Sequence, residues 1–208
     1  MRNTRNLLAL ALMVAGAGHA VAASSVDLSV KGSITPSACT PEMSNGGVYD
    51  MGKLSAKDLK VTSPTRLPTH TMPFKVTCES DTLMALYSQD NRAGSAYNYE
   101  AVGGFGLGLI NGNQKLGLFY AYFESPTVNG APAMIIESFD GGPTWREGDS
   151  LRPTSLMSFA NTSVLAPIPG RLFAADMIIA PFIAPTNSLT LTEEVPIDGS
   201  VTVTVKYL

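Results

Sequence analysis

The sequence predicts an all-β protein, a sandwich or barrel built from eight or more short strands. Short apolar segments recur along the chain between turn residues, and none has the pattern of a helix longer than one turn. Only 15% of the residues are charged, whereas there are 19 glycines and 14 prolines, which is typical of exported β-domains. The clearest strand lies at the end of the sequence, where apolar and polar residues alternate strictly.

Residues 1–23 are predicted to be a secretory signal peptide. Such a leader has a basic start, an apolar run and small residues before the cleavage site. Here these parts are Arg2 with Arg5, Leu7–Ala15, and Ala20–Ala23. Cleavage after Ala22 and cleavage after Ala23 both fit the pattern. We expect the mature chain, residues 24–208, to form a single exported domain.

Two classes of partner are excluded by length and charge. The apolar part of the leader is shorter than the ~20 residues that a membrane-spanning helix needs, and no later apolar segment is long enough. Loss of Arg2 and Arg5 with the leader leaves 12 basic against 17 acidic residues, a net charge of −5. Nucleic-acid binding would need clustered lysines and arginines. We therefore expect no membrane span and no nucleic-acid partner.

The two cysteines, Cys39 and Cys78, are predicted to form a disulfide. An even pair of cysteines in an exported protein is usually oxidised. A zinc site would need four ligands, and no histidine lies close to either thiol in the sequence. The closed loop of ~40 residues would contribute up to ~4 kcal/mol of stability.

The first strand is expected within residues 26–34. Apolar positions alternate there with polar ones, at Val26, Leu28, Val30, Gly32 and Ile34. Gly32 occupies an apolar position, which in a strand marks close packing or a bend. Pro36 ends the segment, and Thr40–Pro73 is expected to be mostly loop.

Several strands are expected in the middle of the chain. Phe74–Cys78 would place Cys78 on the same face as Phe74 and Val76, so that the disulfide joins the ends of the first two strands. Asn111-Gly112 supplies the positive φ of a hairpin turn. Further strands are predicted at Leu83–Tyr87, Phe105–Ile110, Lys115–Phe123, Ala133–Ser138, Met157–Phe159 and Leu172–Ile179.

The final strand, within Gly199–Leu208, is the most regular. Val201, Val203, Val205 and Tyr207 share one face, and the polar residues between them share the other. A half-apolar strand of this kind must pair within its own sheet or with another chain.

Segments along the whole mature chain together carry a family resemblance. They are Val30–Ile34 ahead of Cys39, Tyr49–Leu54, Phe74–Cys78, Gly104–Gly108, Ile135–Gly142, Trp145 and the penultimate Tyr207. The combination resembles the pilins of the bacterial chaperone–usher pathway. It looks most like a pilin-like family catalogued only as a domain of unknown function.

The resemblance implies an immunoglobulin-like sandwich with a missing strand. In such pilins a chaperone, and then the N-terminal strand of a neighbouring subunit, fills the groove that the missing strand leaves. A periplasmic chaperone and other pilin-like subunits are thus the expected partners, in the periplasm or in a fimbria at the cell surface. The strand with Val201, Val203, Val205 and Tyr207 would border the groove.

Two features depart from the pilin pattern. Pilins usually have a glycine about fourteen residues from the end, where this chain has Val195, and the nearest glycine is Gly199. If Val30 begins the first internal strand, only Ser24–Ser29 precede it, a reach of ~20 Å. The segment from Val26 to Ile34 could therefore donate to a neighbour or complete its own fold.

No catalytic, metal or cofactor site is predicted. His70 is the single histidine outside the leader, and no Gly-x-Ser-x-Gly segment accompanies it. The glycines of Gly103–Gly108 lack the lysine of a phosphate-binding loop. We expect a structural or adhesion-associated protein and not an enzyme. The alternative is a self-complete exported sandwich that binds a ligand such as a glycan through Tyr97, Tyr99 and Trp145.

Overall fold

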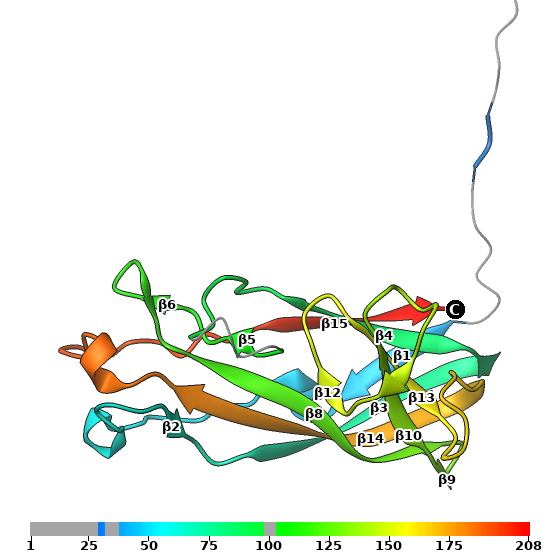
Figure 1. The fold of residues 1–208 in the computed structure, drawn as a ribbon, viewed down its shortest axis with the longest axis horizontal. Coiled ribbons are helices and arrows are strands. Elements are labelled where there is room, and N and C mark those ends of the chain that lie inside the picture. The colour runs from blue at the N-terminus through cyan, green and yellow to red at the C-terminus, as the bar shows by residue number, and fades with distance from the viewer. Residues whose placement is uncertain (1–28, 32–37, 98–102) are drawn as a thin grey trace, which may run out of the picture. The chain divides into compact units, whose positions relative to one another are not determined.

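The computed structural model describes residues 29–31, 38–97 and 103–208 (Figure 1). By its internal contacts the chain divides into two units, Met1–Ile34 and Thr35–Leu208. In the first unit the description covers Ser29, Val30 and Lys31, which are exposed and belong to no strand. The predicted signal peptide lies outside the described residues.

The second unit consists of two main antiparallel sheets. The first has the order β1-β3-β14-β8-β12, with three short strands attached to it, and the second has the order β11-β10-β13-β4-β15. The strands of the first sheet are β1 (Cys39–Met43), β2 (Thr65–Arg66), β3 (His70–Thr82), β5 (Phe105–Gly106), β8 (Gly117–Val128), β9 (Ala131–Pro132), β12 (Ser150–Leu151) and β14 (Gly170–Ile183). Those of the second are β4 (Met84–Asp90), β10 (Met134–Ser138), β11 (Arg146–Glu147), β13 (Leu156–Ala160) and β15 (Val201–Tyr207).

The remaining elements are small. β6 (Leu109–Ile110) and β7 (Gln114–Lys115) form a separate hairpin. Three short 3₁₀ turns are η1 (Ser44–Gly47), η2 (Ala56–Asp58) and η3 (Thr186–Ser188). The predicted all-β sandwich is confirmed.

The core lies between the two main sheets. β3 alternates buried and exposed residues from Met72 to Cys78, and its buried side chains meet residues of β4, β8, β13 and β14 in one cluster. Aromatic rings join the cluster, with centroids 5.2 Å apart for Phe74 and Phe123 and 5.3 Å apart for Phe159 and Phe173. Each large side chain buried in this way contributes roughly 1.5–3 kcal/mol.

A second, smaller apolar cluster packs around Leu107 and Ile183. Its other buried members are Leu67, Ile110 and Leu116. Met51, Val195 and Ile197 are half-buried against it. The segment that leads into β15 is therefore anchored on an apolar base.

The predicted disulfide is confirmed, but its place in the sheet differs from the prediction. Cys39 and Cys78 lie directly opposite each other in the antiparallel pairing of β1 with β3. Cys39 is the first residue of β1, whereas Cys78 lies within the long strand β3. The bond fixes β1 against β3 and does not join two strand ends.

The structure corrects the prediction for the start of the fold. β1 falls in a segment that was expected to be loop. The strand escapes prediction because Thr40, Pro41 and Glu42 are all exposed, so the segment has no alternation of apolar and polar residues. Of the predicted first-strand range, Ser29, Val30 and Lys31 are described; they belong to no strand, and Val30 is 89% exposed. Val26, Leu28, Gly32 and Ile34 lie outside the described residues.

β14 runs further than predicted, through Pro181. A proline in a central strand normally removes a ladder hydrogen bond. Here His70, the first residue of β3, lies opposite Ile179, and Arg66, the last residue of β2, lies opposite Phe182, so Pro181 lies in the gap between these two partners. The predicted positive φ of the Asn111-Gly112 turn is confirmed, with values of 49° and 87°.

Two observations concern the compartment. A disulfide persists in an oxidising environment, so the Cys39–Cys78 bond indicates an extracytoplasmic protein. In the described ranges, no helix has the length and apolar character required to cross a membrane.

Replacing both cysteines by alanine should lower the free energy of unfolding. The bond spans a sequence separation of 39 residues, and the chain-entropy argument gives a loss of about 4 kcal/mol. Urea unfolding followed through the fluorescence of Trp145 measures this loss, with the wild type in reducing agent as a control. An unchanged unfolding midpoint would contradict the role assigned to the bond.

Candidate functional site

β15 is one of the two edge strands of the second sheet, and β11 is the other. It runs antiparallel to β4, in a register that pairs Val201 with Asp90 and Tyr207 with Met84. Among the described residues no other strand pairs with it, and Figure 1 shows it as the red arrow at the end of the chain. Within the described part of the chain, one whole edge of β15 is therefore open.

The bonds at the two ends of β15 show which main-chain groups face that open edge. Asn91 N–H donates to Ser200 O over 3.0 Å, and Leu208 N–H donates to Leu83 O over 3.1 Å. In an antiparallel ladder, alternate residues direct both their N–H and C=O groups to the same partner. The even-numbered residues of β15 therefore bond to β4, and Val201, Val203 and Val205 direct their N–H and C=O groups to the open edge.

The same three valines also face the core. Val201, Val203 and Val205 are half-buried, while Thr202, Thr204 and Lys206 are exposed. The valines pack against the main core cluster. Their main-chain groups therefore point along the sheet to the open edge, where a further strand would lie, and their apolar side chains point to the core face.

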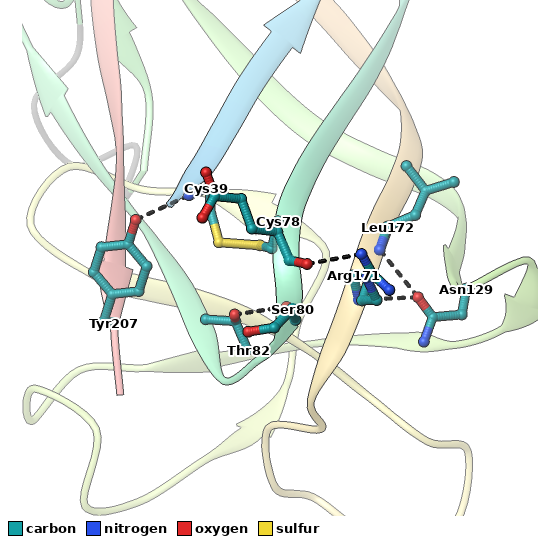
Figure 2. Close-up of a disulfide and its surroundings, with 9 residues drawn as sticks. Cys39, Cys78, Ser80, Thr82, Asn129, Arg171, Leu172 and Tyr207 are labelled. Carbon is teal, nitrogen blue, oxygen red and sulfur yellow. Dashed lines mark hydrogen bonds between the residues drawn. A yellow bond between two sulfur atoms is a disulfide. The ribbon is translucent and has the colours of Figure 1, made fainter. Parts of the chain in front are cut away.

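β1 is the edge strand of the first sheet, and its open edge is a poor template for pairing. Glu79 N–H donates to Ala38 O over 3.0 Å, so Thr40 and Glu42 bond to β3 and the odd-numbered residues face away from it. Pro41 has no N–H group. The N–H of Cys39 donates to Tyr207 Oη over 3.0 Å (Figure 2). Main-chain pairing is thus favoured at β15 and not at β1.

A groove lies between the two edge strands; we call it the β1–β15 groove. Its deeper hollow has a volume of about 260 Å³ and lies over core residues of β3, β8 and β14. A shallower hollow of about 590 Å³ extends it along β1. Met43, Gly47, Val201 and Val203 line both hollows.

One end of the groove is fixed by Tyr207. Its hydroxyl reaches across to the first residue of β1, next to the disulfide (Figure 2). The two edge strands are held together at this end by a side chain and not by a ladder.

The other end is fixed by contacts on the residues that precede β15. Arg92 donates to the carboxylate of Asp198 through Nε and Nη2, over 2.8 and 2.7 Å. The hydrogen bond from Arg92 lowers the pKa of Asp198. Asn91 Nδ2 donates to the hydroxyls of Ser200 and Thr202 over 2.9 and 3.0 Å. These bonds fix the register with which β15 begins.

Gly199 allows the chain to pass closely over the core at this end. A Cβ atom there would lie 2.9 Å from Leu107 Cδ2 and 2.9 Å from Phe119 Cε1, closer than such contacts occur. Gly199 therefore has a packing role close to the position where pilins usually have a glycine. Val195, by contrast, packs on the second apolar cluster.

The structure places the aromatic residues of the glycan hypothesis on separate elements. Tyr97 lies beside β8, where its N–H donates to Gly117 O. Trp145 lies between β10 and β11, beside Gly142. Tyr99 lies outside the described residues.

The loop between β10 and β11 is held by polar contacts. Asp140 accepts hydrogen bonds from Ser138 Oγ over 2.7 Å and from Thr144 N–H over 3.1 Å. At its base, the buried carboxylate of Glu137 forms ion pairs with Arg146 and Arg152, each over 3.1 Å. These contacts fix the loop that carries Trp145.

Sequence comparison shows similarity to proteins whose names describe no activity. Residues 28–105 match the model of a family described as a protein of unknown function (DUF1120). That match contains both cysteines, β1, β3 and β4, but not β15. The chain is 26% identical over 236 residues to the uncharacterized protein YhcF of Escherichia coli (strain K12), covering 95% of this chain and 98% of YhcF. It is 28% identical over 250 residues to protein GltF of the same organism, covering 99% of this chain and 97% of GltF. No solved structure matches the chain significantly.

Tyr207→Phe should loosen the end of the groove without unfolding the protein. It removes the acceptor of the Cys39 N–H, a loss of about 1 kcal/mol. Amide hydrogen exchange at Cys39 should become faster, whereas Tyr87→Phe on the neighbouring strand should leave it unchanged. Equal exchange rates in both variants would show that the bond does not hold β1.

Acid should open the loop around Asp140 only at very low pH. Hydrogen bonds from Thr144 and Ser138 lower the pKa of Asp140 from 3.8 to about 2. Because the folded state favours the carboxylate, its contribution to stability is complete above about pH 4 and is lost as the pH falls through about 2. An NMR titration of the Thr144 amide measures the midpoint, and Asp140→Asn should abolish the transition. A midpoint near 3.8 would contradict the hydrogen-bonded arrangement.

Proposed function

We propose that this protein is a pilin-like structural subunit that acts by taking up a β-strand from another chain in the β1–β15 groove. The observation that carries the proposal is the double exposure of β15. Val201, Val203 and Val205 direct their main-chain hydrogen-bonding groups to the open edge, while their half-buried side chains pack on the core beside it. In strand addition, the main chain supplies affinity and the alternating side chains supply specificity.

The occupant that we propose is an extended segment with apolar residues at alternate positions. Residues 24–38 of a second copy are one such segment, because Val26, Leu28, Val30 and Ile34 alternate with other residues. Among the described residues the first strand begins at Cys39, and Val30 belongs to no strand. If all fifteen residues serve as the donor segment, they reach ~50 Å when extended. The seven residues of β15 cover ~24 Å. The length is therefore sufficient for a donor strand.

In the proposed pathway, a periplasmic chaperone covers the groove until another pilin-like subunit takes its place. The extracytoplasmic disulfide agrees with assembly in the periplasm or at the cell surface. An uncovered apolar edge promotes aggregation, so a chaperone would protect the subunit. The proposed role is structural or adhesion-associated and needs no catalytic step.

A second candidate is glycan binding at the loop between β10 and β11. One observation favours it: Phe139 is 52% exposed, and the guanidinium of Arg146 lies 4.2 Å from the centroid of its ring. An exposed aromatic ring on a fixed loop can stack on a sugar. Binding on a glycan array that is lost in Phe139→Ala, while the fold is kept, would support this candidate.

Appending a donor strand to the chain should stabilise it. Residues 24–36 added after Leu208 through a short glycine-containing turn can return antiparallel along β15. Burial of three apolar side chains at about 1.5 kcal/mol each would raise the free energy of unfolding by about 4.5 kcal/mol. Urea unfolding measures the gain, and an extension with serine at the apolar positions is the matched control.

Two proline substitutions separate strand uptake from stability of the fold. In Val203→Pro the lost N–H faces the open edge, so the β4 ladder remains but the gain from the extension should disappear. In Thr204→Pro the lost N–H belongs to the ladder with β4, so the protein should be destabilised even without the extension. A gain that survives Val203→Pro would contradict strand addition at β15.

A further inference from the structure

Methionine is concentrated in the deeper hollow of the β1–β15 groove. Four of its 17 lining residues are methionines, whereas the whole chain of 208 residues contains nine. They are Met43 in β1, Met51 in the segment that follows η1, Met72 in β3 and Met177 in β14. Four separate segments of the sequence thus bring the same side chain to one place.

The four methionines occupy different depths. Met72 and Met177 are 2% and 3% exposed and belong to the floor, while Met43 and Met51 are half-buried. The sulfur of Met43 lies 3.7 Å from the position that a Cβ of Gly47 would take. Because Gly47 has no side chain, no Cβ atom packs against the Met43 sulfur on this side.

The β15 side of the groove differs in stiffness. Val201 and Val203 are β-branched, which restricts their χ1 rotation. Methionine is unbranched, has three rotatable side-chain bonds and adapts to partners of different shape. The β15 wall therefore binds the main chain of the incoming strand, and the methionine-lined wall can change conformation to fit the side chains of that strand.

Charge adds no further selection in the deeper hollow. None of its 17 lining residues is charged, so an apolar side chain enters without an unpaired charge nearby. Discrimination among apolar side chains then depends on size alone, and an adaptable lining relaxes it.

We propose that the β1–β15 groove accepts β-strands of differing sequence, because its methionines adjust to the size of the apolar side chain that enters the deeper hollow. The inference rests on the proposed function and names the class of strand that the groove takes. The occupants are extended segments with alternating apolar residues, of which residues 24–36 of a second copy are the first candidate. The entering side chain can range in size from valine to phenylalanine.

The experiment measures binding of synthetic peptides to the secreted chain by fluorescence anisotropy. The parent peptide spans residues 24–36, and one series carries Leu28→Val, Leu28→Met or Leu28→Phe. Matched series change Val26 or Val30 in the same way. Shifts in the ε-methyl NMR signals of the groove methionines identify which of these three peptide positions contacts the methionines. At that position, the affinities of wild type for the series should lie within about threefold of one another.

The test variant replaces Met43, Met51, Met72 and Met177 by leucine, which keeps the volume but branches the side chain. Its affinities across the same series should spread by about tenfold or more. Met84→Leu with Met157→Leu, at buried core positions, is the matched control and should behave like wild type. If the fourfold variant fails to fold, Met43→Leu with Met51→Leu replaces it, since both side chains are half-buried.

The outcomes separate this inference from the proposed function. If wild type binds the parent peptide but discriminates as strongly as the methionine variant, the inference is overturned and strand uptake stands. If no peptide binds, or if Val203→Pro leaves binding unchanged, the proposed function fails and the inference fails with it. If the peptide affinities lie close together for wild type and spread widely for the methionine variant, the result supports both the proposed function and this inference.

Discussion

The one-sided ladder between β4 and β15 is the constraint on which the site depends. In an extended chain, side-chain direction and hydrogen-bond direction both alternate with period two. The bonds of Ser200 to Asn91 and of Leu208 to Leu83 set the register of β15 on β4. This register determines, for every residue between them, which way the main-chain groups and the side chain point. The valines that pack on the core are also those whose main-chain groups are unpaired toward the open edge. If β15 shifted by one residue along β4, the valine side chains would face solvent and the valine main-chain groups would bond to β4.

The properties of β1, the opposite wall of the groove, explain why no ladder closes the groove between β1 and β15. β1 is short, contains Pro41 and contributes only Cys39 and Met43 to the interior. It is held by its ladder with β3, by the disulfide to β3 and by one hydrogen bond to Tyr207. Among the described residues, no ladder connects the edge at β1 with the edge at β15. Only side chains cover the core between the two edges. The groove is therefore suited to bind a strand, and its open β15 edge also promotes aggregation.

Sequence alone could predict the parts of the fold that follow a local period. Val201–Tyr207 and Phe74–Cys78 have strict alternation, and the cysteine pair and the Asn111-Gly112 turn have their own local signals. β1 has none, because three consecutive exposed residues separate Cys39 from Met43. Its position also bears on the length of a donor segment, because Val30 belongs to no strand and the first strand among the described residues begins at Cys39.

The groove itself could be predicted only in part. Met72 continues the alternation of Phe74 and Val76 across Pro73, and Met177 lies in a predicted strand, so two of the four methionines could have been found. Met43 and Met51 lie outside any periodic segment. Which strands remain at a sheet edge is a property of the topology and cannot be read from a local pattern.

Amide hydrogen exchange along β15 in the folded, disulfide-bonded protein without a bound partner tests the central claim most directly. NMR resolves each amide of Val201–Tyr207. The account predicts an alternating profile, in which Thr202, Thr204 and Lys206 are protected by β4 and Val201, Val203 and Val205 exchange rapidly. Uniform protection of all six amides would show that the edge is already paired and would contradict the account.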